Sequence, residues 1–261
     1  KVGFNVLAWS AAVSEELFPT IERLKRIGYD GVEFYLGGDD QKSYQQMGNF
    51  TKELGLETTA VITLGSNENP VSESAEVRAR ALDKIKWAVD RAHALNATII
   101  CGPFHSAHTL FVNRPAIEVE YQRAGEVLRA AGEYAAQANI TFALEALNRF
   151  ECYLCNTSEQ LLKLVKEANH PHVQAMFDTH HANIEEKSYG VALDTIAPVL
   201  AHVHISENDR GTPGSGQVLW GDAFAGLAKI NYKGWLTIEA FSRNDPDFAN
   251  AIGVWREFSD P

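Results

Sequence analysis

Two patterns of apolar and polar residues alternate along the chain. Short, nearly continuous apolar runs occur eight times, and several are separated by stretches in which apolar residues recur every three or four positions. The runs predict buried strands and the stretches predict amphipathic helices. The predicted strands are VGFNVLAW (2–9), GVEFYL (31–36), ETTAVITL (57–64), TIICGPF (98–104), ITFALEAL (140–147), VQAMFDTH (173–180), LAHVHIS (200–206) and GWLTIEAF (234–241), and the clearest helices cover 14–28, 75–95 and 122–139.

This order is a strand followed by a helix, repeated eight times within about 250 residues. Its size and order are those of a TIM barrel, in which parallel strands are apolar throughout because helices cover them. A doubly wound open sheet is the alternative, but the chain has no Gly-x-Gly-x-x-Gly opening to support it. The sequence therefore predicts an α/β protein with a single (β/α)8 TIM-barrel domain over residues 1–261.

The composition of the chain excludes some classes of function. The chain is 45% hydrophobic and 22% charged, and its 34 acidic and 23 basic residues give a net charge of −11. That charge opposes binding to nucleic acid and to anionic membranes. Only 3 cysteines occur, no apolar run has the length of a membrane span, and the first residues lack a signal-peptide pattern. We expect a cytoplasmic protein.

Four residues with metal-binding side chains stand at the ends of the last four predicted strands. They are Glu145, Asp178, His204 and Glu239, and each is separated from the next by about one βα unit. In a barrel all four would meet at the C-terminal rim, where three converging carboxylates would repel one another unless a cation lay between them. The sequence predicts a divalent metal there, and this ligand set suits Mn²⁺, Mg²⁺ or Co²⁺ better than a structural zinc ion. The alternative for each acid is a helix cap or a local salt bridge.

Other candidates are weaker. Cys152 and Cys155 have CxxC spacing without a second pair, and His170 and His172 precede the sixth strand, on the opposite face. His202 is interpreted as an interior, hydrogen-bonded histidine one layer below His204. Glu33 could reach the site or form a structural ion pair. The loop RGTPGSGQ (210–217) is only a weak phosphate signal, which favours an unphosphorylated ligand.

Glu145 and Glu239 lie three strands apart on the predicted ring, so they would approach a ligand from separate directions. This arrangement suits removal of a proton on one face of a carbon and delivery on the other. A metal that binds a carbonyl oxygen and a neighbouring hydroxyl would stabilise the enediolate formed in between.

Several segments resemble the D-tagatose 3-epimerase family, which includes D-psicose (D-allulose) and L-ribulose 3-epimerases. They are LEALNRFECYLCN, FDTHHANIEE, HVHISENDRGTPGSGQVLW, IEAFSRN and AIGVWREFSDP. The resemblance implies metal-dependent epimerisation of free ketoses at C3 through a metal-bound cis-enediolate. It assigns Glu145, Asp178, His204 and Glu239 to one divalent metal, usually manganese, cobalt or magnesium, and Glu145 and Glu239 to proton exchange.

The same resemblance implies that Glu151, His181 and Arg210 hold the sugar oxygens, and that the protein is a homodimer or homotetramer. Related chains have a Trp near the position of His108 and continue into a further helix. The pocket near His108 is therefore expected to differ, and the chain is expected to lack the final C-terminal helix of the barrel.

Three other functions remain open from the sequence. An aldose-ketose isomerase or hydroxypyruvate isomerase would use the same barrel and metal. An endonuclease IV-like enzyme would need a zinc cluster and a basic surface, which the net charge of −11 opposes. A metal-dependent sugar sensor would leave the paired glutamates without a role.

Overall fold

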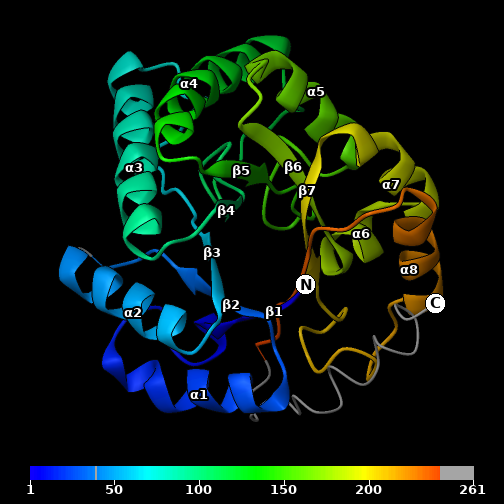
Figure 1. Ribbon diagram of the computed structural model, residues 1–261. Helices are drawn as coiled ribbons and strands as arrows, with labels where there is room; N and C mark the ends of the chain where they lie inside the picture. Colours follow the sequence, from blue (N-terminus) through cyan, green and yellow to red (C-terminus); the bar gives the residue numbers. More distant parts are fainter. Residues whose placement is uncertain (39, 242–261) are drawn as a thin grey trace.

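Eight parallel strands close into a barrel in the computed structural model, which describes residues 1–38 and 40–241 (Figure 1). Each strand pairs with the next one in the chain, and β8 pairs with β1. The predicted TIM barrel is confirmed. The strands are β1 (Val2–Asn5), β2 (Gly31–Tyr35), β3 (Glu57–Val61), β4 (Ile99–Gly102), β5 (Thr141–Leu144), β6 (Val173–Asp178), β7 (Leu200–Ile205) and β8 (Trp235–Ile238).

Helices surround the barrel and connect its strands, as Figure 1 shows. The α-helices are α1 (Phe18–Ile27), α2 (Gln41–Glu53), α3 (Ala75–Ala94), α4 (Glu118–Gln137), α5 (Ser158–Ala168), α6 (Thr179–Glu185), α7 (Tyr189–Ile196) and α8 (Trp220–Lys229), and short 3-10 turns are η1 (Val6–Ala8), η2 (Glu15–Leu17) and η3 (Ala197–Val199). No described helix is long and apolar enough to cross a membrane. The prediction about a final helix, and the extent of the domain to residue 261, fall on 242–261, outside the described residues.

The strands are shorter than their apolar runs. The first run was predicted to continue to Trp9, but β1 ends at Asn5 and the chain turns through η1, whose Val6 is still buried. Glu145 and Glu239 likewise follow β5 and β8 directly instead of lying within them. Burial continues past each strand end because the connecting loops pack over the barrel rim. Apolar character therefore extends beyond the ladder of hydrogen bonds.

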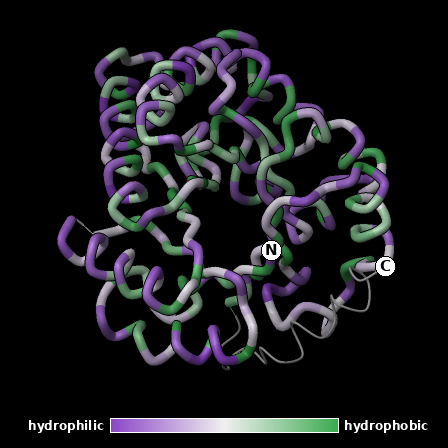
Figure 2. Tube along the Cα trace, viewed as in Figure 1, coloured by the Kyte–Doolittle hydropathy of each residue, from purple (hydrophilic) through white to green (hydrophobic). Residues whose placement is uncertain are grey.

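Two apolar cores hold the elements together. The larger one lies between the strands and the helices, and the smaller one, inside the barrel, contains Val61, Cys101, Ala143 and Met176. Hydrophilic and hydrophobic positions alternate along the outer helices in Figure 2, as expected for helices with one buried face. Local signals set the helix ends. Thr157, for example, accepts a hydrogen bond from the backbone of Gln160 and starts α5.

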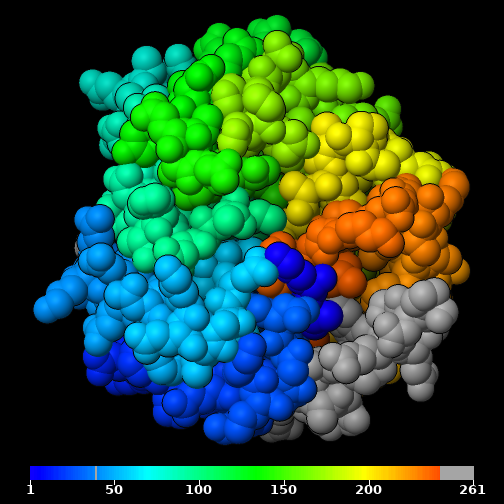
Figure 3. Space-filling model, viewed as in Figure 1, coloured from blue at the N-terminus to red at the C-terminus, as the bar shows by residue number. Residues whose placement is uncertain are grey.

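The seam of the barrel brings the two ends of the described chain together. Val2 pairs with Leu236 and Phe4 with Ile238, and in Figure 3 the first residues, in dark blue, lie beside orange residues of the C-terminal part. Gly31 is required near this seam, because a Cβ there would lie 2.5 Å from both the Glu57 carbonyl oxygen and the ring of Trp235. The seam places Asn5 beside Glu239, which matters for the site.

Candidate active site

The four predicted metal ligands lie together at the C-terminal ends of four strands. Glu145 directly follows β5, Asp178 ends β6, His204 lies near the end of β7 and Glu239 directly follows β8. All four are buried, and each offers one ligand atom such that these atoms lie within 4.8 Å of one another. The structure thus brings together the residues that the strand spacing selected. Their role as metal ligands stays a prediction.

The donor atoms fit a divalent cation. Nδ1 of His204 lies 3.6 Å from Oδ2 of Asp178 and 3.6 Å from Oε2 of Glu239. This nitrogen is fully buried and makes no hydrogen bond within the described part of the chain. Its other ring nitrogen, Nε2, lies 2.7 Å from Oε1 of Glu33. An imidazole held by a carboxylate on one side, with its free nitrogen facing other carboxylates, is a common arrangement of a metal-binding histidine.

Asp178 has two functions in the local fold. Its Oδ1 accepts a hydrogen bond of 2.6 Å from the backbone of His180 and caps α6, while its Oδ2 faces His204. The alternative of a helix-capping acid is therefore correct for one oxygen of Asp178. The cap fixes the rotamer and directs the second oxygen into the cluster.

The pKa values of the two candidate proton-exchanging glutamates are shifted in opposite directions. Burial is the main cause that raises the pKa of Glu145; the hydrogen bond and charge of His181 oppose it, and the charges of Asp178 and Glu239 act in the same direction as burial. Burial acts in the same direction on Glu239, but the charges of Arg210 and His204 bring its pKa below the ordinary value. Two carboxyl groups whose pKa values are pushed apart are suited to separate acid and base roles.

Three further predicted residues line the space beside these carboxylates. The Arg210 guanidinium contacts Glu239, and its Nη1 lies 3.3 Å from Oδ2 of Asp178 while its Nη2 lies 3.0 Å from Nε2 of His181. Nε2 of His181 is also 3.4 Å from Oε1 of Glu145. Arg210 and His181 therefore touch the cluster directly, in positions from which they could contact a bound ligand.

Glu151 lies farther out, on the same side of the site. Its Oε1 accepts a hydrogen bond of 2.8 Å from Asn148, and its Oε2 lies 3.4 Å from Nε2 of His108. The hydrogen bond with His108 is the largest of several contacts that lower the pKa of Glu151 to about 2, against the opposing effect of burial. His108 thus belongs to this polar edge of the site. Asn148, which also contacts His181 Nδ1, was not singled out from the sequence although it opens the NRFE segment.

Weaker candidates from the sequence lie elsewhere. Cys152 and Cys155 are buried free thiols, and His170 and His172 lie before β6, at the end of the barrel opposite the site. His202 is fully buried below His204, with its Nε2 2.9 Å from Oε2 of Glu33. Glu33 therefore does form the interior ion pair, and it also reaches the cluster through His204.

The comparisons with known proteins agree with this geometry. The family model described as xylose isomerase-like TIM barrel matches residues 21–258. The chain is 30% identical to a D-psicose 3-epimerase of Agrobacterium fabrum over 99% of this chain and 91% of that protein. It is 31% identical to a ketose 3-epimerase of Arthrobacter globiformis, with coverage of 98% and 89%. The chain belongs to the ketose 3-epimerase family.

A solved structure supports this membership. The crystal structure of a D-psicose 3-epimerase with D-tagatose, from Clostridium cellulolyticum H10, superimposes with a TM-score of 0.86 at 28% identity, covering 100% of this chain and 91% of that one. The resemblance to the D-tagatose 3-epimerase family is therefore confirmed. The four candidate ligands lie where an active site is expected, because active sites of TIM barrels lie at the C-terminal ends of the strands.

Proposed function

We propose that this protein is a metal-dependent epimerase that inverts C3 of free, unphosphorylated ketoses of the D-tagatose, D-fructose, D-allulose or L-ribulose type. The observation that carries the proposal is the placement of Glu145 and Glu239, which reach one buried cluster from strands three apart. A substrate carbon lying between them would have one carboxylate on each face.

In the proposed reaction one glutamate takes the proton from C3 and the other delivers a proton to the opposite face. Asp178 and His204 complete the ligand set between them, and Glu151, His181 and Arg210 would bind the sugar oxygens and orient C3. A divalent cation bound to the four candidate ligands would supply Lewis-acid stabilisation of the enediolate oxygens. We propose Mn²⁺, with Co²⁺ or Mg²⁺ as alternatives, because the set has three carboxylates, one imidazole and no thiolate.

The proposal has three further parts, which concern the substrate, the compartment and the oligomeric state. A net charge of −11 suits a small neutral sugar better than nucleic acid or an anionic membrane. Three buried thiols without a disulfide fit a reducing compartment, and we place the enzyme in the cytoplasm. By its family resemblance we propose a homodimer or a homotetramer.

Proton NMR in D₂O tests this function directly. The Mn²⁺-reconstituted protein is incubated with D-fructose, D-allulose, D-tagatose or L-ribulose, with and without a chelator, and the sugars are analysed after the metal is removed. Deuterium at C3 together with the C3 epimer, lost on chelation, supports the epimerase. Exchange at C1 with formation of an aldose would instead assign the protein to the isomerases, and no exchange on any of these sugars would contradict the proposal.

A further inference from the structure

A buried carboxylate lies below the candidate metal ligands. Glu33, on β2, is fully buried inside the barrel and accepts hydrogen bonds from residues on four other strands. The donors are Asn5 Nδ2 at 3.1 Å, Thr59 Oγ1 at 2.8 Å, Cys101 Sγ at 3.3 Å and His204 Nε2 at 2.7 Å. Such convergence on one carboxylate offsets the cost of burying its charge and fixes its position.

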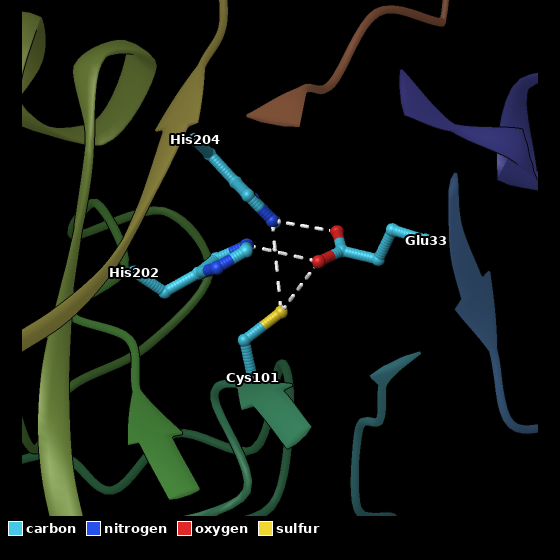
Figure 4. Close-up of side chains that lie close together, drawn as sticks. All are labelled: Glu33, Cys101, His202 and His204. Carbon is cyan, nitrogen blue, oxygen red and sulfur yellow. Dashed lines mark hydrogen bonds and ion pairs between the residues drawn. The ribbon is translucent and has the colours of Figure 1, made fainter. Parts of the chain in front are cut away.

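Figure 4 shows Glu33, Cys101, His202 and His204 pointing toward one another across the barrel interior. These residue types could form a zinc site, but the distances indicate direct contacts. Nε2 of His204 and Nε2 of His202 lie 2.7 and 2.9 Å from the Glu33 oxygens. Ligands arranged tetrahedrally around Zn²⁺ would be separated by about 3.3 Å. The contacts of Glu33 are those of hydrogen bonds and ion pairs, so this group supports the site above it.

The contact with Glu33 determines which nitrogen of His204 carries the proton. A carboxylate only accepts hydrogen bonds, so Nε2 of His204 must be the donor. The lone pair of the neutral ring then lies on Nδ1, which faces Asp178 and Glu239 at 3.6 Å. Glu33 thereby holds the imidazole in the tautomer and orientation that a metal ion at the cluster requires.

A second route leads from Glu33 to Glu239 through Asn5. The side-chain oxygen of Asn5 accepts a hydrogen bond of 3.0 Å from the backbone of Leu7, which directs its Nδ2 toward the carboxylates. Nδ2 lies 3.1 Å from Oε1 of Glu33 and 3.2 Å from Oε1 of Glu239. Glu239 is left with Oε2 facing His204. One buried carboxylate thus orients two of the four candidate ligands.

We infer that Glu33 is the positioning residue of the metal centre, fixing the Nε2–H tautomer of His204 directly and the carboxylate of Glu239 through Asn5. The inference rests on the proposed metal-dependent function and adds to it a residue that touches neither substrate nor metal.

Mn²⁺ affinity tests the inference without reference to turnover. Free Mn²⁺ is followed by electron paramagnetic resonance as it is titrated into the metal-stripped protein, for the wild type, Glu33→Gln and Glu120→Gln. Glu120 is a matched control, because it is a buried carboxylate paired with Arg114, away from the cluster. We expect Glu33→Gln to weaken Mn²⁺ binding about 10- to 100-fold and Glu120→Gln to leave it unchanged. Binding by Glu33→Gln within twofold of the wild type overturns the inference.

The tautomer of His204 can be read in the wild-type protein, so the test survives a Glu33 variant that does not fold. Nitrogen-15 NMR of the Mg²⁺-loaded enzyme, with His204 assigned from a His204→Gln spectrum, should show a proton on Nε2. A proton on Nδ1 would overturn the inference. If the wild type binds neither Mn²⁺ nor Mg²⁺, the proposed metal centre fails as well, whereas tight wild-type binding with an unchanged Glu33→Gln rejects the role of Glu33 alone.

Discussion

Replacing Glu207 by Gln should loosen the loop that carries Arg210. Glu207 is fully buried after β7, and its carboxylate accepts four hydrogen bonds. Oε1 accepts from the backbone of Asn208 at 3.2 Å and of Val218 at 2.8 Å, and Oε2 accepts from the backbone of Gly214 at 2.8 Å and from Nε1 of Trp220 at 3.0 Å. A single carboxylate therefore closes the loop between β7 and α8.

The magnitude follows from these contacts. A glutamine has only one accepting oxygen, so in either amide orientation two donors would face an NH₂ group. Each buried donor left unsatisfied costs about 1 to 3 kcal/mol, which gives a loss of about 2 to 6 kcal/mol in the local stability of the loop. Arg210 is affected because its backbone N–H donates to the Glu207 carbonyl at 3.1 Å and its φ of 59° depends on the loop conformation.

Hydrogen exchange and kinetics measure this effect. We expect exchange protection of the Gly214 and Val218 amides to fall about 30-fold or more, since about 1.4 kcal/mol corresponds to a factor of ten. We expect kcat/KM to fall about 10-fold or more because Arg210 loses its position. Asp209→Asn is the control, because Asp209 accepts one exposed hydrogen bond from Gly211 that an amide oxygen can keep. Wild-type protection and activity in Glu207→Gln would refute the reasoning.

Three other predictions concern the same structure. Glu239→Gln should lower kcat at least about 100-fold and, in D₂O, place deuterium at C3 of one epimer only. The control Glu120→Gln should behave as the wild type. Equal labelling of both epimers by Glu239→Gln would exclude the two-sided mechanism. Burial lowers the pKa of His105 from 6.5 to about 4, so as the pH falls the unfolded chain takes up a proton before the folded chain does. The free energy of unfolding should therefore fall by up to about 3 kcal/mol between about pH 6.5 and 4. Urea titrations should show a shallower pH dependence for His105→Gln, and identical slopes would contradict this. Gly216→Ala should lower the melting temperature, because a Cβ there would lie 2.5 Å from Cγ of Glu207; an unchanged melting temperature would show that the loop adapts.

The meeting of the four candidate ligands at one rim could be predicted because it depends on the order of residues along the chain. Each of these four residues lies at or next to the C-terminal end of a strand, and in a closed parallel barrel all such positions lie on one rim. The spacing of the apolar runs along the chain was therefore sufficient to predict that the four residues lie close together. The fold was predictable for the same reason, because eight alternating strands and helices indicate a parallel barrel.

The supporting contacts could not be predicted in this way. Glu33 meets His204 across the barrel interior, between strands that are not neighbours in the sheet. Such a contact depends on side-chain depth and rotamer, which strand periodicity does not specify. Asn5 lies within an apolar run that predicts one long strand, whereas the strand ends at this residue. Glu207 was missed because its partners are mainly backbone groups of a loop without a repeating pattern.

The hydrogen bond between Asn5 and Glu239 joins residues 234 positions apart across the seam of the barrel. During synthesis the first strand leaves the ribosome long before the eighth, so this contact forms only when nearly the whole barrel has been translated. Metal uptake by the four-residue cluster would accordingly be a late event in biogenesis, and it would report that the barrel has closed. Contacts of such long range also slow folding, and a metal ion bound at the proposed site would help to hold the two ends of the barrel together once they meet.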